Sequence, residues 1–486
     1  MKKRITVSIF CMFLYCILLV GCGSVGEHSL KESEVLQSEE VSSQSSAVPS
    51  QSQIYTEGWQ PTPVPDLSAV DDKLEELKAT KEAIITVGVT STGEDNVYQA
   101  INSFNSSQDK YWAVVKVYDE LSQLLLELTS NKGPDIYYVS GMNYTALAQN
   151  GMFEELTPYL ESSEMISKED IISSAWRAGS VEGKLYFILP RFYPRVMLVE
   201  KGYTKNGAWT MEEYFALAEK YPEGKLSENI TDLEMLIIND LSLSLDSYVN
   251  WEEYTCSFDS VEFVNLLKRL KIYQEKQYES FADYNLAQQL QQKMLLTERT
   301  NILWKDFMVG YKNLRDTLLE FCEIAGMPNE AGELKYLMKY EEFYGMSVVS
   351  KNKEAAWSFL EYTLSEEYLT LQHDDGGPRL GMYPANRKVL ESFLDAEIGN
   401  VPDYVYRYKN EYINAKVDEV TEFTEEDKQV LLNILENCYA GRWIETKETF
   451  KILTEELDYF FQGGKSAEEV AKIIQSRMSL YLMECQ

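Results

Sequence analysis

The sequence predicts an α/β protein built around a parallel sheet, and three observations support this prediction. Residues 84–89 and 113–118 are short apolar runs rich in β-branched side chains, as buried strands are. Residues 96–104 between them repeat apolar side chains at helical spacing, so the three segments form a βαβ unit with parallel strands. The chain has 486 residues, which is enough for two lobes with sizeable cores.

Composition excludes several classes of function. The formal net charge of −33 makes nucleic acid and anionic membranes unfavourable partners, because like charges repel. There are only two histidines, and His28 falls in a linker, so a zinc site or a Ser-His-Asp triad would have to use His373. The cysteines of the body lack metal-ligand spacing, and we expect buried thiols, no metal and no cofactor. These cysteines are Cys256, Cys322, Cys438 and Cys485.

The N-terminus has the pattern of a secretory leader. A basic start is followed by an uncharged apolar run over residues 5–20, which is shorter than a membrane-spanning helix requires. We therefore expect a signal peptide over residues 1–21. The stretch Leu-Val-Gly-Cys that ends at Cys22 resembles the lipobox of bacterial lipoproteins, and this resemblance implies cleavage before Cys22 and lipidation of its thiol. Residues 22–66 are rich in Ser, Gln, Glu and Pro and predict a disordered linker.

The body alternates strands and helices and then becomes helical. After the βαβ unit the pattern predicts a helix over residues 121–129, a strand near 136–139 and a short helix over 144–151. The C-terminal part is predicted to be helical over the segments 425–438, 443–461 and 466–482.

The Gly-Gly-Lys-Ser stretch at residues 463–466 is not a phosphate-binding loop. Tyr459 stands where the motif requires glycine, and a helix rather than a strand precedes it. We expect a helix end at the glycines and an N-cap at Ser466, with Glu469 as its capping-box partner.

The order of motifs between residues 84 and 482 resembles the extracellular solute-binding proteins of bacterial ABC importers, in particular their carbohydrate-binding branch. Each motif is weak alone, and their order and spacing carry the resemblance. The motifs are GPDIYYVS, NGMFEELTPYL, EGKLYFILP, GAWTMEEYFALAEKYP, YVNWEEYTCSFDSVEFVNLLKRLK, YGMSVVSKNKEAAWSFLEYTLSEE, MYPANRKVL and YFFQGGKSAEEVAKIIQSR.

The resemblance implies a two-lobed fold of the type II periplasmic-binding-protein kind. Each lobe would be a mainly parallel sheet flanked by helices, followed by a helical C-terminal part. Lobe 1 would comprise residues 80–190 plus 343–400, and lobe 2 residues 191–342 plus 401–486. The chain would cross between the lobes near residues 190–195, near 344–346 and near Pro402.

The implied function is capture of a mono- or oligosaccharide between the lobes and delivery to the permease subunits of an ABC importer. The protein would act as a monomer, without catalytic residues, lipid-anchored on the extracytoplasmic side of the cell membrane. Two alternatives stay open: a secreted glycoside-active enzyme that uses carboxylates, and a sugar-sensing lipoprotein coupled to a membrane receptor.

Candidate ligand-binding residues follow strand ends and crossovers, because ligands of α/β sheets bind outside the carboxyl ends of the strands. Aromatic rings would stack on a sugar face, and hydroxyl or carboxylate groups would bond to its hydroxyls. Trp209 and Trp251 match positions that look structural and are left out. The candidates are Ser91, Thr92, Ser140, Arg191, Phe192, Tyr193, Trp304, Tyr344 and Asp375.

Overall fold

The computed structural model describes most of the body of the protein. All described residues belong to one compact unit, Pro63–Gln486. The predicted signal peptide, Cys22 and the linker lie outside the described residues, as do the candidates Ser91, Thr92, Trp304 and Asp375. The described residues are 77, 79–90, 94–130, 132–227, 236–274, 286–302, 321–370, 382–399, 422–441 and 447–485.

The first sheet contains the predicted βαβ unit, and its strand order is β2-β1-β3-β13-β6. β1 and β2 pair in parallel along their whole length, from Ala83 opposite Tyr111 to Thr90 opposite Tyr118. β3 also runs parallel to β1, whereas β13 is antiparallel to both β3 and β6. The strands are β1 (Ala83–Thr90), β2 (Tyr111–Tyr118), β3 (Ile136–Tyr138), β6 (Phe187–Ile188) and β13 (Tyr344–Met346).

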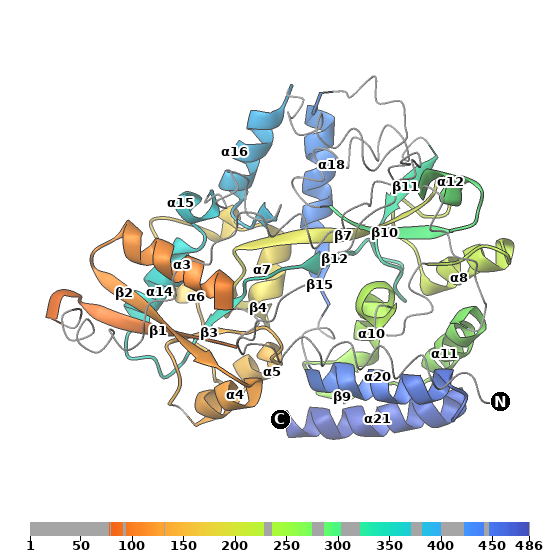
Figure 1. The fold of residues 1–486 in the computed structure, drawn as a ribbon, viewed down its shortest axis with the longest axis horizontal. Coiled ribbons are helices and arrows are strands. Elements are labelled where there is room, and N and C mark those ends of the chain that lie inside the picture. The colour runs from red at the N-terminus through yellow and green to blue at the C-terminus, as the bar shows by residue number, and fades with distance from the viewer. Residues whose placement is uncertain are drawn as a thin grey trace, which may run out of the picture. The chain divides into compact units, whose positions relative to one another are not determined.

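Helices cover both faces of this sheet. Figure 1 shows α3 (Glu94–Ser107) and α4 (Leu121–Thr129) on opposite sides of it. α14 (Lys353–Tyr362) shares the face of α3, because the rings of Phe104 and Phe359 meet edge to face with centroids 5.3 Å apart. On the other face, Gly88 of β1 leaves room for Leu124 of α4, where a side chain would collide with Pro134. The bounds of α4 are those predicted.

The second sheet is organised around one long strand, β7. β10, β11, β12 and β14 all pair with β7 in antiparallel fashion, and β15 runs parallel to its neighbour, β12. The prediction of a mainly parallel sheet in each lobe is therefore wrong for this sheet. Its strands come from distant segments of the chain and pair antiparallel with β7, whereas βαβ units would give parallel neighbours. The strands are β7 (Arg191–Glu200), β10 (Thr297–Asn301), β11 (Cys322–Ala325), β12 (Tyr336–Lys339), β14 (Tyr383–Pro384) and β15 (Cys438–Ala440).

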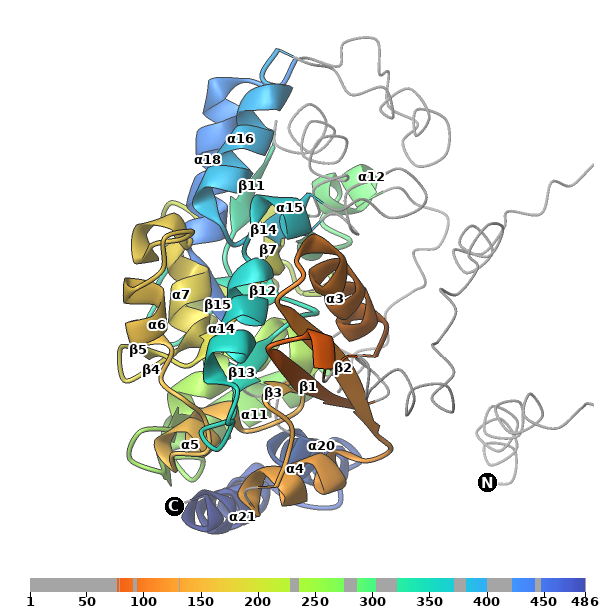
Figure 2. The ribbon, with the colours of Figure 1, turned by 90° about the vertical axis from the view of Figure 1, so that its left-hand side faces the viewer.

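Helices form the ends of the body. α16 (Arg387–Glu397) and α18 (Glu425–Glu436) lie side by side in both views (Figure 1, Figure 2), and the ion pairs Lys428–Asp395 and Arg387–Glu436 join them. α20 (Lys447–Phe461) and α21 (Ala467–Glu484) pack together at the opposite end. Ser466 caps α21 and forms a capping box with Glu469, which confirms that prediction.

The remaining elements are short or lie on the second sheet and between the sheets. The helices are α5 (Tyr144–Gln149), α6 (Thr157–Glu161), α7 (Ser173–Gly179), α8 (Met211–Lys220), α10 (Ser242–Leu245), α11 (Val261–Gln274), α12 (Leu286–Gln291) and α15 (Glu366–Leu369). Single turns are η5 (Lys168–Asp170), η6 (Leu236–Leu241) and η7 (Asp246–Tyr248). Two small hairpins complete the set: β4 (Ser180–Val181) with β5 (Lys184–Leu185), and β8 (Val249–Asn250) with β9 (Thr255–Cys256).

Two large apolar cores share β7. Phe192 and Val196 belong to the core around the first sheet, whereas Met197 and Val199 belong to the core formed with α8, α11, α20 and α21. β1, β2, β3, β6 and β13 lie in the first sheet, and β7, β10, β11, β12 and β15 lie in the second. Two segments extend across the predicted lobe bounds: β14 pairs with β7, and α18 packs into the first core through Leu431 and Ile434. The bounds themselves stay a prediction.

Candidate functional site

The loop after β3 carries the first polar residue of the site. Ser140 is exposed at the carboxyl end of this strand and hydrogen-bonds to the phenol of Tyr138. That phenol donates to the backbone carbonyl oxygen of Glu341, on the segment that leads from β12 to β13. Burial and the negative charges of Glu342 and Glu341 raise the pKa of Tyr138, so its hydroxyl stays a proton donor. Ser140 is thereby placed beside the crossover between the sheets.

The first residues of β7 present a polar edge. Side chains alternate along this strand, so that Phe192 is buried while Tyr193 and Arg195 are half-buried. The Arg195 Nε donates to Asn301 Oδ1 over 2.7 Å, at the end of the neighbouring β10. Burial raises the pKa of Tyr193; the charge of Arg195 opposes this and that of Glu341 adds to it, so these groups lie within electrostatic reach.

We call this set the crossover face and define it as Ser140, Tyr193, Arg195, Asn301 and Glu341. Its members come from segments far apart in the sequence: Ser140 and Glu341 are linked through the phenol of Tyr138, Arg195 and Asn301 by a hydrogen bond, and the charge of Glu341 acts on Tyr193. The set offers a phenol ring with an apolar face, hydroxyl and amide groups that both donate and accept, one cation and one carboxylate. This mixture suits the hydroxyls and the apolar ring face of a polyol.

Three predicted residues lie at the crossover with their side chains directed into the core. Phe192 and Tyr344 are 0% exposed, and Tyr344 packs edge to face on Tyr138 and Phe359. Arg191 is 2% exposed and forms an ion pair with Glu342. A solute in the surrounding water does not reach these side chains in this arrangement, and they are not part of the crossover face.

Sequence reasoning overlooked Arg195, Asn301 and Glu341. The period-2 alternation of β7 was available as a signal for Arg195, since residues 193 and 195 must share a face once Phe192 is buried. Nothing in the local pattern marks Glu341 or Asn301, because their place follows from strand pairing.

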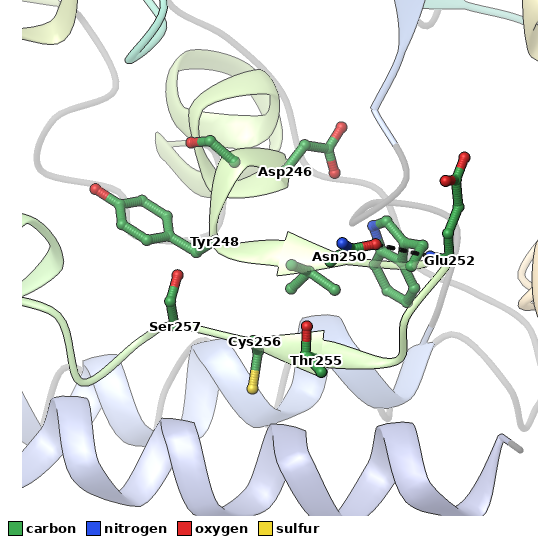
Figure 3. Close-up of a pocket in the computed structure, with 10 residues that line it drawn as sticks. Asp246, Tyr248, Asn250, Glu252, Thr255, Cys256 and Ser257 are labelled. Carbon is green, nitrogen blue, oxygen red and sulfur yellow. Dashed lines mark hydrogen bonds between the residues drawn. The ribbon is translucent and has the colours of Figure 1, made fainter.

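A pocket of about 530 Å³ lies at the β8–β9 hairpin (Figure 3). Figure 3 shows Asp246 above the hairpin, Glu252 at its turn and Cys256 pointing toward the helix below it. Burial raises the pKa of Cys256, whose thiol lies 3.4 Å from Ser479 Oγ of α21. The thiol is therefore protonated and a poor nucleophile. The pocket is lined by Asp246, Ser247, Tyr248, Val249, Asn250, Trp251, Glu252, Thr255, Cys256 and Ser257.

Hydrogen bonds connect this hairpin with the segments that follow β3. Tyr254 in the hairpin turn donates to Gln149 Oε1 of α5 over 2.9 Å. The Asn143 side-chain amide donates to Tyr481 Oη over 3.0 Å, and that of Asn150 donates to the Cys485 carbonyl over 2.7 Å. The end of α21 thus contacts the loop that carries Ser140, and the hairpin rests on the same helix.

The sequence profile of the bacterial extracellular solute-binding protein family matches residues 99–400, which is more than half of the chain. The chain belongs to this family. The match spans β2, β3, β6, β7 and β13, and so covers the predicted crossovers near residues 190–195 and 344–346 and all five residues of the crossover face. Members of this family are extracellular binding proteins, which places this solute-binding protein outside the cytoplasm.

The fold of the chain matches that of a solved structure at low sequence identity. The sugar-binding protein MalE from Xanthomonas citri is 15% identical with a TM-score of 0.50, covering 82% of this chain and 98% of that one. An ABC substrate-binding protein from Listeria monocytogenes in complex with cycloalternan is 16% identical with a TM-score of 0.48, covering 82% and 99%. A solute-binding protein from Thermotoga lettingae bound with α-D-tagatose is 14% identical with a TM-score of 0.47, covering 83% and 100%. The predicted two-lobed periplasmic-binding-protein-like fold is confirmed.

No curated protein sequence matches the solute-binding protein significantly. Among the helices that the structure describes, none combines the length and apolar character needed to cross a bilayer.

Proposed function

We propose that the solute-binding protein captures a mono- or oligosaccharide between its lobes and delivers it to the permease subunits of an ABC importer. The crossover face carries this proposal, because it places polar groups of both sheets on one accessible edge within a solute-binding fold. The neighbouring structures with bound sugars support the same class of ligand, and the family supports the extracytoplasmic setting.

The chemistry of the crossover face favours a neutral sugar. Tyr193 offers an apolar ring face for stacking, and Arg195, Asn301, Glu341 and Ser140 offer donors and acceptors for hydroxyl groups. A phosphorylated sugar would require several Arg or Lys side chains or the N-terminus of a helix. Here Arg195 and Lys339, which pairs with Tyr193, are accompanied by the carboxylate of Glu341. Further ligand contacts are proposed at Ser91, Thr92, Trp304 and Asp375, which lie outside the described residues.

The leader and linker supply the remaining part of the proposal. A thiol at a newly formed N-terminus is the group that a lipid can join through a thioether, so Cys22 is the proposed anchor. Residues 22–66 then act as a tether, with an end-to-end reach of about 35–40 Å for a flexible chain of this length. The folded body acts as a monomer on the extracytoplasmic side of the membrane, without a cofactor and without catalytic residues.

A screen against mono- and oligosaccharides tests the proposal. A ligand at a hundred times its dissociation constant adds about 2.7 kcal/mol to the stability of the folded protein, which a thermal-shift assay detects. Each ligand found in this way is confirmed by calorimetry, and the reaction mixture is examined for cleaved sugar. Binding without cleavage supports the proposal. Turnover of the sugar contradicts it in favour of a glycoside-active enzyme, and stabilisation by none of the sugars contradicts the choice of ligand class.

A further inference from the structure

The two crossover segments lie next to each other. On the side of the second sheet, Lys339 of β12 pairs with Tyr193 of β7. On the side of the first sheet, Tyr344 of β13 pairs with Ile188 of β6. Residues 189–192 and 340–343 therefore run antiparallel between the two pairings, and a rotation of one lobe against the other would bend these two segments.

A buried polar cluster joins these segments to each other and to α15. Arg191 and Glu342 are 2% and 1% exposed, and Nη1 of Arg191 lies 3.5 Å from Oε2 of Glu342. The Arg191 Nη2 donates to the backbone carbonyl oxygen of Tyr368 over 2.5 Å, and its guanidinium lies 4.5 Å from the centre of the Tyr368 ring. The Tyr368 hydroxyl donates to Glu342 Oε1 over 2.9 Å. We call Arg191, Glu342 and Tyr368 the hinge cluster.

A buried ion pair is a poor device for stability alone. Taking two charges out of water costs about as much as their attraction returns, and an apolar pair of similar volume is often as stable. Hydrogen-bonded charges nevertheless fix distance and direction more tightly than apolar contacts, because guanidinium and carboxylate groups have defined bonding directions. The hinge cluster therefore determines geometry more than it determines the free energy of unfolding.

The geometry in question is that of the crossover face. Glu341 directly precedes Glu342, and Tyr193 follows Arg191 by two residues along β7. A change in the spacing of Arg191 and Glu342 therefore moves Tyr193 and Glu341 relative to each other. We propose that the hinge cluster is a positioning device, which holds the two crossovers in register and presents Tyr193 and Glu341 to the solute. The part of this inference that concerns the solute rests on the proposed function, and the part that concerns the two crossovers rests on the structure alone.

The mildest test removes one hydrogen bond. Tyr368→Phe keeps the ring and the backbone carbonyl that Arg191 uses, and removes only the hydroxyl that donates to Glu342. The matched control is Tyr118→Phe, because the Tyr118 hydroxyl also donates to a carboxylate, that of Glu127, but on β2, at the edge of the first sheet and separated from β13 by β1 and β3. Hydrogen–deuterium exchange is measured without ligand. We expect faster exchange in residues 191–196 and 336–343 of Tyr368→Phe only, and equal exchange in both variants would overturn the proposal whether or not a sugar binds.

Affinity provides the second measurement, with maltotriose as the probe. Tyr368→Phe is expected to weaken binding about tenfold, which is the lower range for a hydrogen bond to a charged group, whereas Tyr118→Phe leaves the affinity unchanged. The double variant Arg191→Met/Glu342→Leu separates positioning from stability. It is expected to melt near the wild-type temperature and still to bind about tenfold more weakly or worse. Wild-type affinity in a folded double variant means that the cluster is only structural. If the wild type does not bind maltotriose, the choice of sugar is wrong, and the exchange measurement still decides on the cluster.

Discussion

We predict opposite effects on stability and binding for substitutions at two adjacent residues of β7. Phe192 is 0% exposed in the first core, whereas Tyr193 is half-buried on the crossover face. Phe192→Ala should therefore destabilise the fold and leave the site of the remaining folded molecules intact. Tyr193→Ala should do the reverse, because the residue contributes to binding more than to the core. The pair tests the assignment of side-chain direction within a single strand.

The magnitudes follow from burial. Replacing a fully buried Phe by Ala costs about 3–5 kcal/mol, through lost burial and the cavity left behind. For a lobe of 150–250 residues this lowers the Tm by about 6 °C or more. Tyr193→Ala should change stability by only about 1 kcal/mol, as is usual for a partly exposed side chain. Loss of its stacking should cost about 2 kcal/mol of binding, which corresponds to roughly a thirtyfold increase in Kd.

Calorimetric titration with a sugar found by the screen and thermal melting are performed on both variants. Tyr459→Ala is the control, because Tyr459 is 57% exposed on α20 and remote in sequence from the crossovers. It should change neither affinity nor Tm appreciably. The reasoning is refuted if Tyr193→Ala binds as tightly as the wild type while its Tm falls as far as that of Phe192→Ala.

Two further predictions concern other parts of the chain. Burial would raise the pKa of Glu436, but hydrogen bonds from Ser173 and the charge of Arg387 outweigh it and lower this pKa below the unfolded value. The carboxylate thus stabilises the fold above about pH 4.5, and this stabilisation is lost as the pH falls through the folded pKa. Glu436→Gln should lower the free energy of unfolding by about 1 kcal/mol at pH 7 and by less at pH 3.5, as measured by urea titration. An equal loss at both pH values would contradict the assignment. Cys22→Ala should release the protein from washed membranes, and a variant that stays membrane-bound would show that Cys22 is not the anchor.

Segments that bury one face could be predicted well from the sequence. The spacing of apolar side chains in residues 84–118 is enough to give β1, α3 and β2, because period and burial are local properties. The capping box of Ser466 and Glu469 was equally predictable, since both partners lie within one turn. The antiparallel course of the second sheet was not, because the direction of a strand depends on segments far along the chain.

The candidate site shows the same division. Strand ends and crossovers could be located, and Ser140 and Tyr193 lie there on an accessible edge. The direction in which each side chain points could not be predicted from the sequence. Arg191 has the composition of a ligand-binding residue, yet its partners Glu342 and Tyr368 are distant in sequence and hold it inside the protein. Asn301 and Glu341 reach the site for a similar reason, through pairing with β7 and contact with Tyr138.

The order of strands in the first sheet constrains how the chain is made. β13 lies between β3 and β6 in this sheet, but it comes from residues 344–346, after four strands of the second sheet, β7, β10, β11 and β12. A chain that emerges from its N-terminus can therefore pair β1, β2 and β3, but it exposes β6 without the strand that joins β6 to them. Neither sheet can close early, and folding waits for contacts between distant segments, which makes it slow. Such a polypeptide is well suited to threading through a translocation channel in extended form, because neither sheet is complete until segments of the C-terminal half have emerged.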